Sequence, residues 1–178
     1  MALTLIKEDG TGKANANSYA TAVDGDAYHD GHLYPAAWTA ATADRKDAAL
    51  VMATRLIDAE YQFNGTKAND GQALQWPRYL CPDADCARLW GGTAYVSSDQ
   101  VPKAVVDAVC EMARELLIVD RTAAPAGEGL KYLNDGGTQT GYDKSDTRPV
   151  ISPVAQAMLA KLGALIKSRG GAVRLVRT

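Results

Sequence analysis

The feature that most constrains the fold is a wide apolar stripe between residues 42 and 64. Apolar side chains recur there at helical spacing, in two neighbouring rows. One row is Leu50, Ala53, Ile57 and Tyr61, and the other is Ala49, Met52, Leu56 and Phe63. Thr42 is suited to cap this helix, and Asn64 with Gly65 is suited to end it. A helix that is apolar over two rows is expected at the centre of a core.

Three more helices are predicted around the central one. The first is expected to be capped by Ser18 and to end at Gly31. Another begins at Pro102, which suits a first helical position, and ends before Pro125. The last is expected to open at residues 152–153 and to end near residues 170–171. These elements predict a bundle of about four helices.

The segments between these helices carry turn signals. Residues 66–101 hold five Gly and Pro residues and two tryptophans, Trp76 and Trp90, which predicts a long loop packed by its own side chains. Residues 130–133 and 142–145 flank the turn-forming residues 134–137, which predicts a β-hairpin. Residues 3–7 alternate weakly and suit a short strand.

The fold class predicted from these patterns is mainly α. It is a small helical bundle of about four helices with a long packed loop, a β-hairpin and an extended C-terminal arm. We expect a helical domain with the hairpin over residues 1–150, and a C-terminal helix with a docking tail over residues 151–178. A chain of 178 residues is long enough to bury a core of this kind.

The charge balance disfavours a general nucleic-acid binder. The formal net charge is -2, whereas phosphate contacts normally require an excess of Lys and Arg. The first nine residues lack the charged and apolar regions of a signal peptide, and no stretch approaches the roughly 20 apolar residues of a membrane span. We therefore expect the protein in the cytoplasm, or in a particle assembled there.

Two clusters could hold a metal ion, and both match metal sites poorly. Asp26, His29, Asp30 and His32 lie close together in sequence, but no further strong ligand accompanies them. The cluster is more typical of a polar helix end on the surface.

Cys81 and Cys86 form a C-x4-C pair with no second pair to complete a zinc site. Cys110 lies next to the apolar stripe of its helix and is interpreted as a small core residue. No phosphate-binding loop, nucleophile elbow or zinc-protease motif is present in the sequence. The sequence therefore predicts no catalytic residue, no cofactor and no metal, and the chain is not expected to be an enzyme.

The C-terminal end carries local positive charge on an otherwise acidic chain. Its predicted docking residues are Arg169, Arg174, Leu175, Val176 and Arg177. Alternation of arginines with apolar residues fits an arm that becomes ordered against a partner. A frayed, solvated terminus fits equally well.

Several segments in order resemble one phage protein family. They are Ala16-Asn17-Ser18-Tyr19, the helix from Lys46 to Asp58 with its K-x-A-A-L-x-x-A-T-x-x-I-D pattern, residues 61–65, the Q-x-L-x-W-P-R turn from Gln72 to Arg78, and the helix that starts at residues 101–105. This set resembles the family often labelled DnaT-like single-stranded DNA-binding protein, whose members look like head–tail connector proteins of tailed phages. Residues 79–98 are inserted relative to that pattern.

The resemblance implies a structural head–tail adaptor in the virion neck, assembled in the host cytoplasm. Its expected partners are further copies of itself in a ring of about twelve, the portal protein, a tail or neck completion protein, and double-stranded DNA passing through the channel. The hairpin residues Tyr132, Leu133 and Tyr142 are expected at the ring interface. Trp76, Pro77 and Arg78 are expected to stabilise a turn rather than to bind a ligand.

Two other hypotheses stay open on sequence alone. One is a single-stranded DNA-binding accessory protein of phage replication, as the family label implies. The other is a small metal-dependent enzyme built on the histidine or cysteine cluster. Salt-dependent DNA binding would identify the first, and stoichiometric bound metal would identify the second.

Overall fold

The computed structural model describes residues 3–85, 94–124, 132–135, 138–141 and 148–166. Within these residues the chain forms five helices and six short strands. The helices are α1 (Ala22–Asp30), α2 (Ala36–Thr39), α3 (Ala43–Glu60), α4 (Lys103–Ile118) and α5 (Pro153–Leu159). The strands are β1 (Tyr61–Phe63), β2 (Thr66–Lys67), β3 (Arg78–Tyr79), β4 (Tyr132–Asp135), β5 (Thr138–Gly141) and β6 (Gly163–Leu165).

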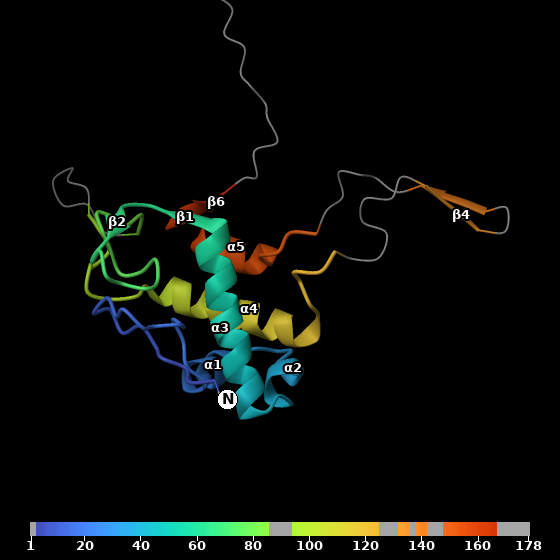
Figure 1. Cartoon of the computed structure of the whole chain (residues 1–178), viewed down its shortest axis with the longest axis horizontal. Coiled ribbons are helices and arrows are strands. Elements are labelled where there is room, and N and C mark those ends of the chain that lie inside the picture. Colours follow the sequence, from blue (N-terminus) through green and yellow to red (C-terminus); the bar gives the residue numbers. More distant parts are fainter. Residues whose placement is uncertain (1–2, 86–93, 125–131, 136–137, 142–147, 167–178) are drawn as a thin grey trace, which may run out of the picture.

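Helix α4 is the hub of the helical core. It packs against α3 and α5, and its other neighbours are α1 and α2. Figure 1 shows α3 crossing α4, with α1 and α2 near one end of α3 and α5 near the other. Val105, Val109 and Met112 recur at helical spacing along α4 and are fully buried. Cys110 is fully buried too, which confirms its interpretation as a core residue.

The first apolar row of α3 is buried as the sequence predicts, Met52 and Leu56 of the second row are partly buried, and the last member of each row belongs to a strand. Leu50, Ala53 and Ile57 are fully buried. Tyr61 and Phe63 lie in β1, where alternate residues face the core, and β1 pairs antiparallel with β6. Tyr61 and Phe63 are two residues apart, a spacing that fits both the end of a wide apolar helix face and a strand. They form a strand because they pair with β6.

The predicted fold class, a mainly α bundle of about four helices, is wrong. The described residues contain three two-stranded antiparallel sheets, β1–β6, β2–β3 and β4–β5, in addition to five helices. The β2–β3 and β6 strands consist of two or three residues, too few for a sequence period to register. The partner of β6 is β1, about a hundred residues earlier in the chain, so local sequence carries no sign of that pairing.

Several element boundaries differ from the prediction. Helix α1 is capped by Thr21 rather than Ser18, because Thr21 and Asp24 form a capping box. The hydroxyl of Ser18 instead donates to the carbonyl of Ala20. Residues 3–7 form no strand, and only Lys7 makes an isolated bridge, with Ser18. The four-residue helix α2, which buries Trp38, was not predicted.

The last predicted helix is shorter than expected. Helix α5 starts where predicted, with Ser152 as N-cap and Pro153 in the first turn, but it ends at Leu159. The chain then forms β6 on β1. Ile151, Ala155 and Leu159 belong to the same core cluster as the residues of α3 and α4. The division of the chain at residue 150 stays a prediction.

The first strand of the hairpin begins two residues later than predicted, and the second begins four residues earlier. Tyr132–Asp135 pairs with Thr138–Gly141, and residues 136–137 between them lie outside the described residues. Figure 1 shows β4, the labelled strand of this hairpin, well to one side of the helices. The connecting segments, like residues 86–93 of the inserted segment and the tail at 167–178, lie outside the described residues.

Candidate functional site

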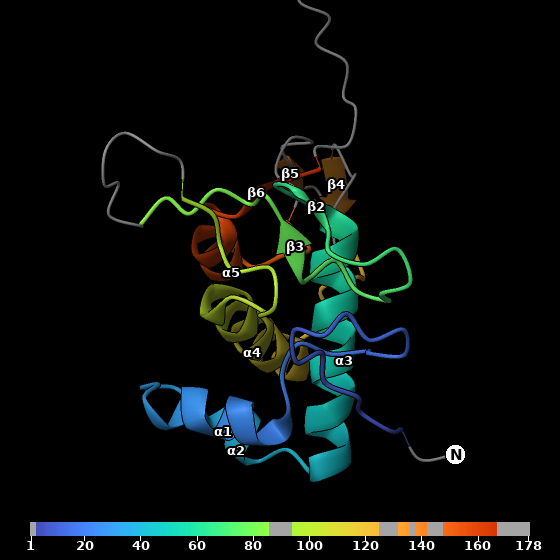
Figure 2. The ribbon, with the colours of Figure 1, turned by 90° about the vertical axis from the view of Figure 1, so that its left-hand side faces the viewer.

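The candidate site is a pocket where three separate parts of the chain meet. It is lined by Ala16 and Asn17 from the N-terminal segment, Val51, Arg55 and Asp58 from α3, and Ala73 and Leu74 from the loop between β2 and β3. Its volume is about 300 Å³. Figure 2 shows the N-terminal segment and the β2–β3 loop lying along α3. Three of the five family-like segments singled out in the sequence supply this lining.

A glutamate shapes the N-terminal wall of the pocket. Glu8 is completely buried, and its carboxylate accepts hydrogen bonds from the backbone N–H groups of Gly10, Gly12 and Lys13. Gly10 has a φ of 101°, which side-chain-bearing residues rarely adopt. The carbonyl of Lys13 then accepts from the N–H of Ala73, which joins this wall to the β2–β3 loop.

The Q-x-L-x-W-P-R segment forms the opposite wall. The side-chain amide of Gln72 donates to the carbonyls of Leu74 and Pro77 and accepts from the N–H of Asn69. This closes the loop on itself and presents Leu74 to the pocket. The peptide between Trp76 and Pro77 is cis.

The predicted motif residues Trp76 and Arg78 lie behind the pocket. Trp76 is fully buried, and its ring meets that of Phe63 edge to face at 5.6 Å. The Arg78 guanidinium donates to the carbonyls of Phe63, Asn64, Gly65 and Gln75, and to the side chain of Gln75. Arg78 thus caps the chain where it leaves α3 and β1, and it takes no part in lining the pocket.

Asp58 is the most chemically distinctive residue of the lining. Its Oδ1 accepts from the hydroxyl of Tyr19 at 2.7 Å, and its Oδ2 accepts from the N–H of Gln75 at 3.0 Å. Burial raises the pKa of Asp58 to about 6, although these hydrogen bonds and the charges of Lys67 and Arg78 oppose that rise. Burial likewise raises the pKa of Tyr19 well above its ordinary value.

Two cations, Arg55 and Lys67, flank the pocket, and Lys67 Nζ donates a 3.5 Å hydrogen bond to the carbonyl of Gln72. Arg55 is exposed on α3 and lines the pocket, and Lys67 on β2 is close enough for its charge to lower the pKa of Asp58. In the described part of the chain, neither has an acidic group within ion-pair distance. The other described lysines are all ion-paired: Lys7, Lys13, Lys46, Lys103 and Lys161.

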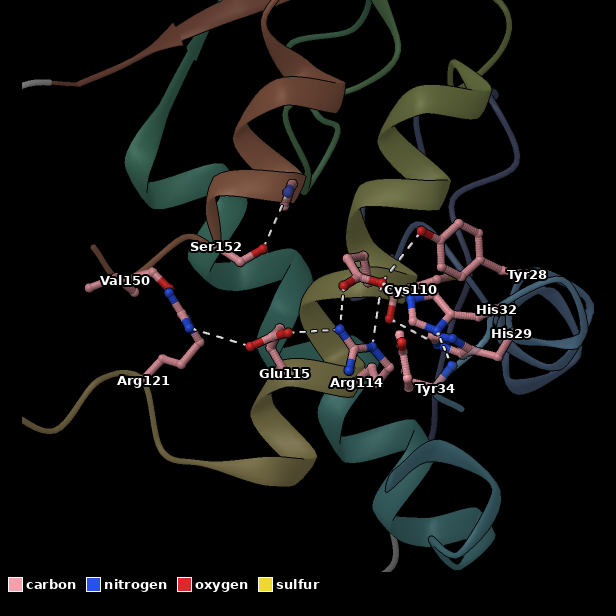
Figure 3. A network of polar contacts seen from close by, with 12 residues as sticks. Tyr28, His29, His32, Tyr34, Cys110, Arg114, Glu115, Arg121, Val150 and Ser152 are labelled. Atoms are coloured by element: carbon pink, nitrogen blue, oxygen red, sulfur yellow. Dashed lines mark hydrogen bonds and ion pairs between the residues drawn. The ribbon is translucent and has the colours of Figure 1, made fainter. Parts of the chain in front are cut away.

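In a second polar cluster, between α1 and α4, the charged side chains pair with one another (Figure 3). The Glu111 side chain is only 3% exposed and forms an ion pair with Arg114. Its Oε2 lies 3.4 Å from the Tyr28 hydroxyl and 3.6 Å from His32 Nε2. Arg114 also binds Glu115 at 2.8 Å.

Arg121 extends this cluster towards α5. It lies 3.4 Å from Glu115 and donates to the carbonyls of Pro149 and Val150. The cluster therefore ties α1, α4 and the segment before α5 together. We refer to Tyr28, His32, Glu111, Arg114, Glu115 and Arg121 as the Glu111 network.

The predicted histidine–carboxylate cluster is dispersed among different partners. Asp26 binds Trp38 Nε1 at 2.8 Å and Lys46 Nζ at 2.7 Å. His29 is buried, with Nε2 3.2 Å from the carbonyl of Cys110 and its ring against Trp38. His29 and His32 are therefore part of the helix packing and not the surface helix end expected from sequence. Within the described ranges, no three His, Cys, Asp or Glu side chains converge to hold a metal ion.

The remaining predicted site residues fall outside this pocket. Tyr132 and Leu133 lie in β4, and Tyr142 lies beyond the described residues. The docking residues Arg169, Arg174, Leu175, Val176 and Arg177 also lie outside the described residues. Sequence reasoning missed Asp58 as a candidate; the signal that could have found it is its place as the final aspartate of the K-x-A-A-L-x-x-A-T-x-x-I-D pattern.

The fold and the pocket define a small mixed helix–strand protein with a concave, partly apolar surface flanked by cations. None of its described helices has the length and apolarity that crossing a membrane requires. The chain belongs to the family described as "Putative DnaT-like ssDNA binding protein", whose model matches residues 3–178. Searches of curated proteins and of solved structures gave no match.

Proposed function

We propose that this protein binds single-stranded DNA and that the Asp58 pocket with its flanking cations is part of the binding surface. The observation that carries the proposal is membership, over residues 3–178, in a family described by single-stranded DNA binding. The structure supports it through Arg55 and Lys67, which lie beside a concave surface and have no acidic partner in the described residues.

The arrangement of charge suggests how single-stranded DNA would lie on this surface. Asp58 would repel a phosphate at the bottom of the pocket, whereas Arg55 and Lys67 attract phosphate at its edge. An unstacked base has the size and apolar faces to enter a pocket walled by Val51, Leu74 and Ala16. The backbone would follow the cations, and a base would point inward.

A salt titration of binding tests this proposal. We expect a labelled single-stranded oligonucleotide to bind with an affinity that falls as salt rises. Arg55→Ala and Lys67→Ala should each lower the slope of log affinity against log salt by about 0.7, the value for one lost phosphate contact on a single strand. Fluorescence anisotropy measures both quantities.

The matched control is Arg45→Ala. Arg45 is also exposed on α3 but does not line the Asp58 pocket. Its loss should leave the salt slope unchanged. Absence of binding by the wild-type protein at physiological salt, or equal effects of Arg45→Ala and Arg55→Ala, would contradict the proposal.

A second candidate function is the head–tail adaptor of a tailed phage. In that role the protein forms a ring of about twelve copies in the virion neck, between the portal and a tail or neck completion protein, around a channel for double-stranded DNA. The observation that favours it is the β4–β5 hairpin, which lies apart from the helices and offers an extension to a neighbouring copy. The net charge of -2 also suits a channel along which DNA slides.

The two candidates differ in what they need from the hairpin. Replacing residues 132–141 by a short Gly–Ser linker should abolish ring assembly on the portal if the adaptor function holds. The same change should leave oligonucleotide binding at the Asp58 pocket intact. Electron microscopy of portal complexes and anisotropy on the same variant separate the two.

A further inference from the structure

The carboxylate of Asp58 can accept more hydrogen bonds than its partners inside the protein donate, so it can also accept from a ligand in the pocket. Each carboxylate oxygen can accept about two hydrogen bonds. Oδ1 receives one from Tyr19 and Oδ2 receives one from Gln75 among the described residues. Each oxygen therefore retains accepting capacity, and the side chain is only partly buried where it lines the pocket.

The other polar groups of the lining are differently placed. The side-chain oxygen of Asn17 accepts from the N–H of Ile6 at 2.7 Å, and its amide donates to the carbonyl of Thr4 at 2.9 Å. Arg55 is exposed, and we expect its guanidinium to contact a phosphate of the DNA rather than a base. The remaining lining residues are apolar, so Asp58 dominates the hydrogen-bonding character of the pocket.

A carboxylate acceptor discriminates among bases by their exocyclic groups. Cytosine presents an N4 amine and adenine an N6 amine, both donors, whereas thymine and uracil present a carbonyl oxygen at the corresponding position. An amine satisfies the carboxylate, while a carbonyl oxygen placed against it leaves two acceptors facing each other in a partly apolar pocket.

We propose that the Asp58 pocket is a base-selective subsite that accepts bases with an exocyclic amine in preference to thymine or uracil. This inference rests on the proposed single-stranded DNA binding and adds the class of base that the site takes. Asp58 is its specificity-determining residue, and Arg55 and Lys67 contribute affinity for any sequence.

Oligo(dC) and oligo(dU) of equal length provide the test, because cytosine carries an amine at position 4 and an acceptor at N3, whereas uracil carries a carbonyl at position 4 and an N–H donor at N3. The wild-type protein should bind oligo(dC) about fivefold to tenfold more tightly than oligo(dU), the lower end of the range for one side chain–base hydrogen-bonded pair. Asp58→Asn replaces one acceptor by a donor and should bring the two affinities within about twofold.

Asp58→Asn could disturb the fold through the hydrogen bond between Asp58 and Tyr19. A second variant, which fills the pocket and leaves Asp58 in place, therefore tests the proposal independently. Ala73 is exposed and lines the pocket, so Ala73→Phe should fill the space and remove the preference for oligo(dC). The matched control is Ala157→Phe, an exposed position on α5 outside the pocket, which should keep the wild-type preference.

The outcomes separate the two proposals. Equal binding of oligo(dC) and oligo(dU) by the wild-type protein overturns the base preference and leaves single-stranded DNA binding in place. A preference that survives Ala73→Phe also overturns the assignment to this pocket. Failure of both oligonucleotides to bind overturns the proposed function itself.

Discussion

The Asp58 pocket and the Glu111 network both place a carboxylate in a helical core, and they treat it in opposite ways. Glu111 has an arginine partner and lies within a chain of contacts that joins α1, α4 and the segment before α5. Asp58 has a tyrosine and a backbone N–H, with no ion-pair partner in the described residues. The first carboxylate is fully engaged inside the protein, and the second faces an opening.

The difference shows that a structural carboxylate can be told from a candidate binding residue by whether a cation inside the protein pairs with it. A buried carboxylate that is matched by a cation mainly fixes the packing of its neighbours. A carboxylate whose pKa is raised by burial, beside a pocket, is a candidate for binding. By that criterion the Glu111 network holds the helices together, and the Asp58 pocket is the region available to a partner.

Removing Glu111 should have the largest effect on stability. Glu111→Ala leaves Arg114, which is 12% exposed, without its main partner, and it empties a buried space. Breaking a buried ion pair in this way is expected to lower the free energy of unfolding by about 3–5 kcal/mol. Urea denaturation measures the change.

The control for Glu111 is an exposed ion pair on the same helix. Lys103 and Asp107 pair across one turn of α4, and the Lys103 side chain is 84% exposed. Lys103→Ala should change stability by less than about 0.5 kcal/mol. Similar effects of the two substitutions would contradict the structural role of the Glu111 network.

The pH dependence of stability should reveal Asp58. Its pKa of about 6 in the folded protein exceeds the ordinary value of 3.8, so the folded state binds the proton more tightly than the unfolded state. Stability is therefore lost as pH rises from about 4 to about 6, by roughly 2–3 kcal/mol from this group.

Asp58→Asn removes this titration and isolates its contribution. The free energy of unfolding of the wild-type protein minus that of the variant should fall between pH 4 and pH 6. His29 acts in the other direction, because burial lowers its pKa and protonation at low pH opposes folding. A wild-type-minus-variant difference that is flat across this pH range would mean that Asp58 is not buried as described.

Gly25, in α1, packs against Trp38 and provides a test with a smaller expected effect. A Cβ added at Gly25 would lie within 3 Å of two ring carbons of Trp38, the residue against which His29 packs. Gly25→Ala should destabilise the protein by about 1–3 kcal/mol through overpacking. Thermal unfolding measures the change in stability.

Gly31 serves as the comparison for Gly25. It follows α1 with a φ of -88°, and the nearest atom to an added Cβ is 3.8 Å away. Gly31→Ala should therefore be close to neutral. A cost at Gly31 equal to that at Gly25 would show that loss of glycine itself, rather than contact with Trp38, determines the result.

The sequence by itself determined the long helices and their buried faces. The stripe in α3 and the stripe in α4 are continuous over three or more turns, so their period identifies both the helix and the side that faces the core. Ser152 with Pro153 identified the start of α5, because capping is a local interaction between neighbouring residues. The Q-x-L-x-W-P-R turn was likewise recognised from adjacent residues.

Only the tertiary structure decided the fold class and the candidate site. Tyr61 and Phe63 form a strand because β6, about a hundred residues later, pairs with them. Asp58 becomes distinctive because Tyr19 and the loop at Gln75 cover it and because Lys67 lies near it. Burial and long-range pairing depend on which distant segments come together, and no local period of the sequence records that.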